Sequence, residues 1–344
     1  MAHMIDQTTG KAAMAYVGDT PWHGLGQRLR PGANIHTWQQ AAGLNYEVLH
    51  ATVEYTPENG TSSSQSSLRQ GPLQFVDRQV LYRSDTHAAL SVVSKSYKVV
   101  QPSEVLHFFD DLAKIGGFEL ETAGALSDGK RIWGLAKVND GAPIVGQDLV
   151  RPYLLLATSY DGQMATIAKF TAIRVVCHNT LTMAVNLSDV GSRPNHLGVS
   201  STVRIPHNQT FHPERIREKL GVVNNIWYKW LKNTRQLAER EMNEKQAYAF
   251  LTQLLNPKID SPKTEKEISQ LMNLFNENLI GSDLTGGHNR WRMLNVITEH
   301  VDHNRGRNTD TRLKSAWFGA GEKLKNRAYE MLMSHEEFEN ELTE

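Results

Sequence analysis

The region between residues 118 and 176 constrains the fold most, because strand-like runs there alternate with tight, glycine-containing turns. Two β-hairpins are predicted: Phe118–Ala125 with Arg131–Val138, and Tyr153–Ser159 with Met164–Val176. The turn of the first contains Ser127-Asp128-Gly129 and that of the second Asp161-Gly162, and Gly-containing turns of this kind favour hairpins. No crossover helices separate these strands, which argues against a parallel, doubly wound sheet. We therefore predict an antiparallel sheet.

The flanking residues complete an N-terminal domain. Four segments are assigned: a strand at Asn45–Tyr55, a hairpin of Val80–Arg83 with Ala88–Val93, a helix that begins near Ser103, and a last strand at Ser200–Ile205. Ser103 is a suitable N-cap, and Gly116-Gly117 would stop the helix. Residues 1–35 look irregular, and residues 58–71 look like a polar loop. Together these segments predict an antiparallel α+β domain over residues 1–206.

The pattern changes after Pro213. Apolar residues recur at helical spacing from Ile216 to Leu254, and Pro257 and Pro262 interrupt them. Further helices are predicted at Lys263–Leu279, Asn289–Asp302 and Thr311–Met333. We therefore predict a helical domain over residues 207–344.

The charge balance limits the possible functions. The chain has 37 Lys and Arg against 37 Asp and Glu, which gives a net charge of zero. A protein that binds polyanions over its whole surface usually carries an excess of basic residues. Any nucleic-acid site must therefore be a local basic patch on a neutral body.

The cysteine content suggests a reducing compartment, and the hydropathy suggests that no segment crosses a membrane. The only cysteine, Cys177, cannot form a disulfide within the chain. No apolar run approaches the roughly 20 residues that cross a bilayer, and Met1–Gly10 lacks the layout of a signal peptide. We predict a cytoplasmic protein with no membrane partner.

Three short motifs suggest a metal site, a phosphate-binding loop and a catalytic dyad. For each we favour a structural explanation. His300 and His303 stand three residues apart on a predicted helix, a spacing that suits a metal, but a polar helix end explains them as well. The turn around Gly286-Gly287 is not followed by the Gly-Lys-Ser/Thr of a phosphate-binding loop, which favours a plain helix start. Cys177-His178 are neighbours in sequence and therefore cannot easily form a catalytic dyad. We expect no cofactor, no catalytic residues and no bound metal.

A more distributed pattern suggests contact with nucleic acid. Between Lys130 and Arg174 there are six basic residues and three acidic ones, interleaved with aromatic residues on predicted strands. Cations that follow phosphates and rings that stack on bases are typical of single-strand binding. The candidate residues are Lys95, Tyr97, Lys98, Lys130, Arg131, Trp133, Lys137, Tyr160, Lys169 and Arg174. The alternative is that the charges are solvated and the rings pack inward.

Several motifs resemble a known family. They are Pro21–Gly26, Ser96–Val100, Arg174–Leu181 and Trp291–His303. They resemble the phage/plasmid-like proteins that contain domain of unknown function nine-three-two, and the matches span nearly the whole chain. The resemblance implies a protein carried by phages, plasmids or integrative elements. It also suggests a remote similarity to single-strand annealing proteins, whose core is a strongly bent antiparallel sheet with a helix across it.

Three functions follow as hypotheses. The leading one is a non-enzymatic protein that binds or anneals single-stranded DNA in recombination and forms a homo-oligomer. The second is a metal-dependent nuclease or hydrolase that uses His300 and His303. The third is an anti-defence protein that binds a host protein through its helical region, which would explain the neutral charge.

Overall fold

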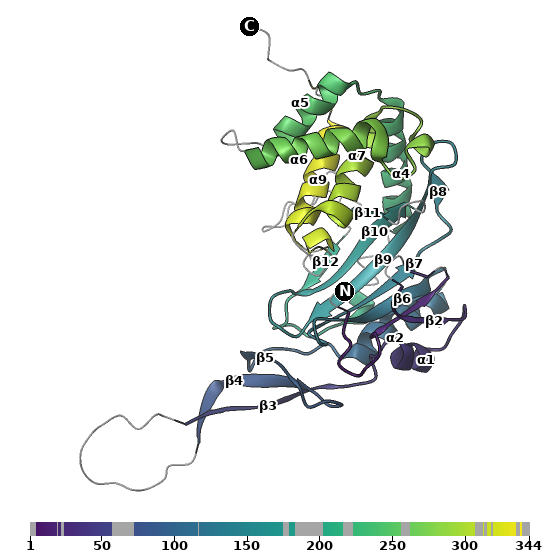
Figure 1. The fold of residues 1–344 in the computed structure, drawn as a ribbon. Helices are drawn as coiled ribbons and strands as arrows, with labels where there is room; N and C mark the ends of the chain where they lie inside the picture. The colour runs from purple at the N-terminus through teal and green to yellow at the C-terminus, as the bar shows by residue number, and fades with distance from the viewer. Residues whose placement is uncertain are drawn as a thin grey trace, which may run out of the picture.

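The computed structural model describes residues 5–18, 20–21, 24–56, 72–115, 117–174, 179–182, 202–215, 223–255, 262–306, 312, 315–317, 319–334 and 338. The predicted polar loop at 58–71 and the Cys177-His178 pair lie outside these residues. The described chain has mainly antiparallel sheets in its N-terminal part and helices in its C-terminal part, so the predicted α+β class is confirmed (Figure 1). None of the described helices is both long and apolar enough to cross a membrane.

The main sheet has nine strands among the described residues, and its central path runs β11-β10-β9-β7-β6-β1-β2. The two predicted hairpins form its centre: β6 (Glu119–Leu126) with β7 (Arg131–Lys137), and β9 (Leu149–Ser159) with β10 (Thr166–Arg174). Both pairings are antiparallel, as predicted. Ser127, Asp128 and Gly129 all have positive φ angles, the backbone twist that a tight hairpin turn requires.

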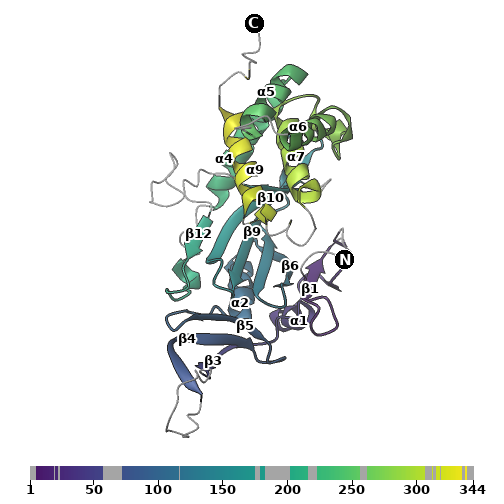
Figure 2. The same cartoon turned by 60° about the vertical axis from the view of Figure 1, so that its left-hand side comes forward.

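One edge of β10 is shared by two short strands. β12 (Thr202–Ile205) pairs with the first half of β10, from Thr166 to Lys169. β11 (Asn179–Thr182) pairs with the second half, from Thr171 to Arg174. A further short strand, β8 (Ala142–Pro143), pairs with β9. Figure 2 shows β12 at the side of the main sheet, with β4 and β5 below it in that view.

The N-terminal residues are more ordered than the sequence suggested. β1 (Met14–Val17) pairs antiparallel with β6, and β2 (Gln27–Leu29) pairs parallel with β1. The prediction that residues 1–35 are irregular is therefore wrong for these two strands. Strands of four and three residues are too short to show alternation. β6, which pairs with β1, lies about a hundred residues further along the chain, and β2 joins the sheet through β1.

Helix α2 (Pro102–Ile115) lies across one face of the main sheet. Its apolar side chains Val105, Leu106, Phe108 and Phe109 are buried. The short helix α1 (Ile35–Ala41), which the side chain of Asn34 caps, packs beside it. The close contact between α2 and the sheet depends on Gly134 of β7, because a Cβ atom there would lie 2.5 Å from Cε2 of Phe109.

Gly134→Ala is expected to lower the free energy of unfolding by about 1–3 kcal/mol, the usual cost of overpacking a core. Phe109 is 2% exposed and has little room to move away from the added methyl group. Urea unfolding measures the effect. In a Phe109→Leu background the cost of Gly134→Ala should shrink, and an equal cost in both backgrounds would contradict this explanation.

A second, three-stranded sheet projects from the body as an arm (Figure 1). It consists of β3 (Val48–Tyr55), β4 (Leu73–Arg83) and β5 (Ala89–Ser94), and the predicted hairpin of β4 with β5 is confirmed. At its base, the buried Arg83 forms ion pairs with Asp6 and Asp85. Further out, apolar side chains are exposed: Tyr55, Leu73, Phe75, Val76 and Val92.

The C-terminal helices form a cap on the other side of the main sheet from the arm (Figure 1). They are α4 (Val223–Glu239), α5 (Glu244–Leu255), α6 (Pro262–Asn273), η1 (Leu274–Asn278), η2 (Ser282–Thr285), α7 (Arg290–Glu299), η3 (His300–Asn304) and α9 (Ala320–Met333). Trp227 and Trp230 are buried and stacked, with ring centroids 5.5 Å apart. α7 begins at Asn289, whose side chain caps Arg292 N, so the predicted helix start after Gly286-Gly287 is confirmed.

Candidate nucleic-acid interface

Three adjoining hollows lie between the arm, the β9–β10 turn and the face of the main sheet that Trp317 covers. The wide hollow, of about 540 Å³, and the narrow hollow, of about 190 Å³, share Gln163, Met164 and Ala165 in their walls. The terminal hollow, of about 20 Å³, shares Lys169 and Trp317 with the narrow one. Because each hollow shares wall residues with the next, we treat them as one groove that tapers from the arm toward α9.

The wide hollow lies between the arm, the β9–β10 turn and the residues that follow β12. Arg78, exposed on β4, and Val92 on β5 form its wall on the arm. Opposite them, Tyr97 stacks on His207 with ring centroids 4.3 Å apart and an interplanar angle of 14°. The Tyr97 hydroxyl donates to Ser159 O, which holds the ring in this position.

His207 joins two segments of the wide hollow. Its Nδ1 lies 3.1 Å from Lys98 O and its Nε2 lies 3.0 Å from Met164 O. A neutral imidazole can donate only one of these hydrogen bonds. Burial lowers the pKa of His207, while the two carbonyl oxygens and Asp161 act in the opposite direction.

The free energy of unfolding is expected to decrease as the pH falls below about 6.5, the ordinary pKa of histidine. Because the pKa of His207 is lowered in the folded chain, the unfolded chain takes up the proton first, which favours unfolding. Urea unfolding between pH 7.5 and 5.5 measures this, with His207→Gln as the matched variant that cannot titrate. Identical pH profiles for the two proteins would refute the assignment.

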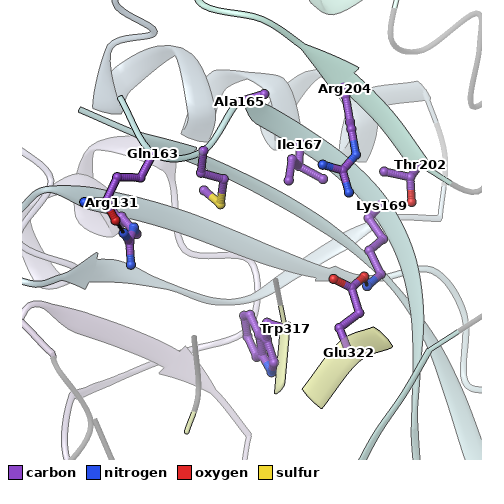
Figure 3. A pocket seen from close by; sticks show the side chains of 10 residues that line it. Arg131, Gln163, Ala165, Ile167, Lys169, Thr202, Arg204, Trp317 and Glu322 are labelled. Atoms are coloured by element: carbon purple, nitrogen blue, oxygen red, sulfur yellow. Dashed lines mark hydrogen bonds and ion pairs between the residues drawn. The ribbon is translucent and has the colours of Figure 1, made fainter. Parts of the chain in front are cut away.

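The narrow hollow brings together cations from three strands (Figure 3). Arg131 of β7 donates from Nη2 to Asp161 Oδ2 at 2.6 Å and to Gln163 Oε1 at 3.1 Å. Arg204 enters from β12 and is exposed. Lys169 of β10 points toward Glu322 of α9 and forms an ion pair with it. The ring of Trp317 lies on the same side as Glu322.

A second buried ion pair joins α9 to η3. Lys325 Nζ, also on α9, lies 2.8 Å from Asp302 Oδ1, and the Lys325 side chain is 3% exposed. Burial lowers the pKa of Lys169, and the coulombic attraction and hydrogen bond of Glu322 oppose this shift. The Lys169–Glu322 pair ties α9 to β10 of the sheet, and the Lys325–Asp302 pair ties α9 to η3.

The groove carries a positive charge although the chain is neutral. Five cations contribute to its walls: Arg78, Arg131, Lys169, Arg204 and Lys325. Two carboxylates, Asp161 and Glu322, also line it, and a third, Asp302, pairs with Lys325. Five cations against three carboxylates leave a small local excess of positive charge on a neutral chain.

The structure brings some of the predicted residues to this groove. Tyr97 lines the wide hollow, and Arg131 and Lys169 line the narrow one. Lys95 and Lys98 are exposed next to Ser94, Ser96 and Tyr97 of the wide hollow. Lys130 is partly buried in the turn that precedes Arg131.

The predicted stacking roles of Trp133 and Tyr160 are wrong. Tyr160 is fully buried in the core, and its hydroxyl donates to Val100 O at 2.9 Å. Trp133 is 6% exposed, and its ring packs edge to face on Trp317 at 5.7 Å. Neither ring presents a free face to a base.

Lys137 and Arg174 do not belong to the groove either. Lys137 lies at the other end of β7, about 20 Å from Arg131 at roughly 3.3 Å per residue, and it pairs with Glu119 and Asp140. Arg174 is fully buried. Its Nε lies 2.7 Å from Asp148 Oδ1, and its two terminal nitrogens donate to Ile280 O and Gly281 O. The predicted phosphate contact of Arg174 is therefore wrong, because the side chain is a structural tie between β10 and the helical cap.

Five of the cationic and aromatic residues of the groove were not among the predictions: Arg78, Arg204, Lys325, His207 and Trp317. Arg204 stands between Val203 and Ile205 on a strand, as a solvated surface charge does, and Arg78 stands between the polar residues Asp77 and Gln79. His207 follows the last predicted strand, and Trp317 lies on the predicted helix Thr311–Met333 with no local sign that it reaches the sheet. Only the pairing of β12 with β10 and the position of α9 bring them together.

His300 and His303, the candidates for a metal site, lie on the π-helical turn η3 that follows α7. His300 is buried, and its Nε2 lies 3.0 Å from Glu267 Oε1. Within the described part of the chain, no group of three or more His, Cys, Asp or Glu side chains is arranged to hold a metal ion.

A comparison with models of known protein families shows which family the chain belongs to. The family model "Domain of unknown function (DUF932)" matches residues 89–317, from β5 through Trp317. The chain belongs to the DUF932 family. The matched region contains the main hairpins, α2 and most of the groove, while Arg78 lies before it and Glu322 after it. The searches of curated proteins and of solved structures gave no match to this DUF932 protein.

Proposed function

We propose that this DUF932 protein binds single-stranded nucleic acid, in the first place single-stranded DNA, in the tapering groove beside β10. A non-enzymatic role in annealing or recombination on a mobile genetic element would use such binding. The observation that carries the proposal is that cations and aromatic rings from separate strands line neighbouring hollows, which share Gln163, Met164 and Ala165.

The chemistry of the walls suits an unpaired strand better than a small apolar ligand. Arg78 and Arg204 are exposed and can follow a phosphate backbone. The Tyr97–His207 stack in the wide hollow and Trp317 in the narrow hollow provide aromatic surface. Base stacking on aromatic side chains contributes about 1–3 kcal/mol per base in single-strand binding proteins.

A fluorescent oligothymidylate should bind with an affinity that falls steeply as the salt concentration rises, because phosphate contacts release condensed counterions. Fluorescence anisotropy across a salt series measures the slope. The same sequence as a duplex should bind more weakly, since a stacked duplex cannot offer its bases to Tyr97, His207 or Trp317. Absence of binding at low salt, or binding that does not change with salt, would refute the proposal.

The homo-oligomer and the host-protein partner both stay predictions. The exposed apolar side chains of the arm are the surface where a protein partner would gain most from burial. The mass of the protein in solution, measured by light scattering, tests the oligomer directly.

A further inference from the structure

The groove closes toward α9. Its successive hollows shrink from about 540 Å³ to about 190 Å³ and then to about 20 Å³. The last has no room for a nucleotide. A strand that enters over the arm and the β9–β10 turn therefore meets a wall formed by Trp317 and the Lys169–Glu322 ion pair.

The cations are concentrated at this closed end. Arg131, Lys169 and Arg204 all line the narrow hollow together with Glu322, whereas the wide hollow has Arg78 and Asp161, of which Asp161 pairs with Arg131. A terminal phosphate monoester carries about −1.5 to −2 charges at neutral pH, while an internal phosphodiester carries a single charge. The closed end therefore matches the more highly charged group.

Lys169 and Arg204 lie together at this end, on the paired strands β10 and β12 (Figure 3). Arg204 is exposed. Lys169 Nζ has three donors, and the Glu322 contact uses one of them. Arg131 lies further along the hollow, where its Nη2 contacts Asp161 and Gln163 and its Nε is buried. A phosphate can therefore contact Lys169 and Arg204 without breaking the Lys169–Glu322 ion pair.

From this geometry we infer that the narrow hollow is a subsite for the terminal phosphate of a single strand, held by Lys169 and Arg204. The inference rests on the proposed function and makes it more specific: the protein recognises strand ends. The bases that follow the terminal phosphate lie along the wide hollow, beside the Tyr97–His207 stack.

The test compares four forms of one oligothymidylate: linear with a 5′-phosphate, linear with a 3′-phosphate, linear with hydroxyl groups at both ends, and covalently closed circular. Anisotropy at fixed salt should show that one phosphorylated form binds about tenfold more tightly than the hydroxyl form, as about 1.4 kcal/mol from charge-assisted hydrogen bonds implies. The circle should bind no better than the hydroxyl form.

Substitutions then show which side chains cause the preference for a phosphorylated end. Arg204→Ala should remove the preference for the phosphorylated end, whereas Arg78→Ala should weaken all four forms by the same factor. Arg28→Ala, a control at an exposed position on β2 at the far edge of the main sheet, should change nothing. Circular dichroism confirms that each variant is folded.

The outcomes separate the two proposals. Equal affinity for all four forms would overturn the end-recognition inference and leave single-strand binding intact. A preference that survives Arg204→Ala would also overturn it, because the phosphate would then bind elsewhere. Absence of binding by every form would overturn both.

Discussion

Arg174→Met is expected to lower the free energy of unfolding by about 3–5 kcal/mol, the usual effect of removing one partner of a buried ion pair. Arg174 and Asp148 are both fully buried, with Arg174 Nε 2.7 Å from Asp148 Oδ1. The substitution also leaves Ile280 O and Gly281 O without their Arg174 donors. Since a domain is stable by about 5–15 kcal/mol in total, this loss is large.

Urea unfolding of two further variants shows whether the ion pair is the cause. Lys137→Met removes a more exposed cation on β7 and should cost no more than about 1 kcal/mol. Adding Asp148→Asn to Arg174→Met should restore part of the stability, because it removes the uncompensated charge while its amide oxygen can still accept from Trp291 Nε1. Similar losses for Arg174→Met and Lys137→Met would contradict the structural role given to Arg174.

The elements that the sequence predicted correctly are those whose contacts are local. The hairpin of β6 with β7 needs only a Gly-containing turn between two runs of strand-forming residues, and all of that information lies within twenty residues. Helix α2 follows from its apolar stripe, but it begins at Pro102, so Ser103 lies inside the helix and is not its N-cap. The start of α7 follows from the capping side chain of Asn289. The short strand β1 depends on the distant β6 and β2 depends on β1, and both strands were missed.

The predicted nucleic-acid contacts of β7 were partly wrong because both faces of the main sheet are covered. Strand alternation correctly places Arg131, Trp133 and Lys137 on one side of β7, and we expected solvent on that side. The apolar side chains of this face instead form a second core cluster, to which Trp317 adds its ring. A contact between residues nearly two hundred positions apart leaves no local pattern, so burial of Trp133 could not be predicted.

The burial of the basic residues has the same origin. A strand that contains Lys169 and Arg174 reads as an exposed, cationic strand, because isolated charges are costly to bury. Their carboxylate partners, Glu322 and Asp148, come from other parts of the chain. The sequence therefore indicated which strands carry positive charge, while the tertiary structure decides which of those charges remain available to a ligand.

Charge reversal at the two exposed arginines of the groove tests the availability of those charges. Arg78→Glu combined with Arg204→Glu should weaken oligothymidylate binding about a hundredfold, about tenfold for each position. Tenfold corresponds to about 1.4 kcal/mol, a modest value for losing a phosphate contact and adding a repulsive charge. The two side chains line different hollows, so their effects should be additive. Each lost contact should also reduce the salt slope by about 0.7, the value for single strands.

The matched control is Arg28→Glu combined with Lys229→Glu. Both residues are exposed, and neither lines any of the three hollows of the groove. The control pair changes the net charge by the same amount, so it reproduces any general loss of electrostatic attraction. If it weakens binding as much as the groove pair, the oligonucleotide responds to the charge of the whole molecule and not to the groove. If only the groove pair weakens binding, the ligand contacts Arg78 and Arg204. These side chains come from separate sheets, so one bound strand must then span both the arm and the β12 edge of the main sheet.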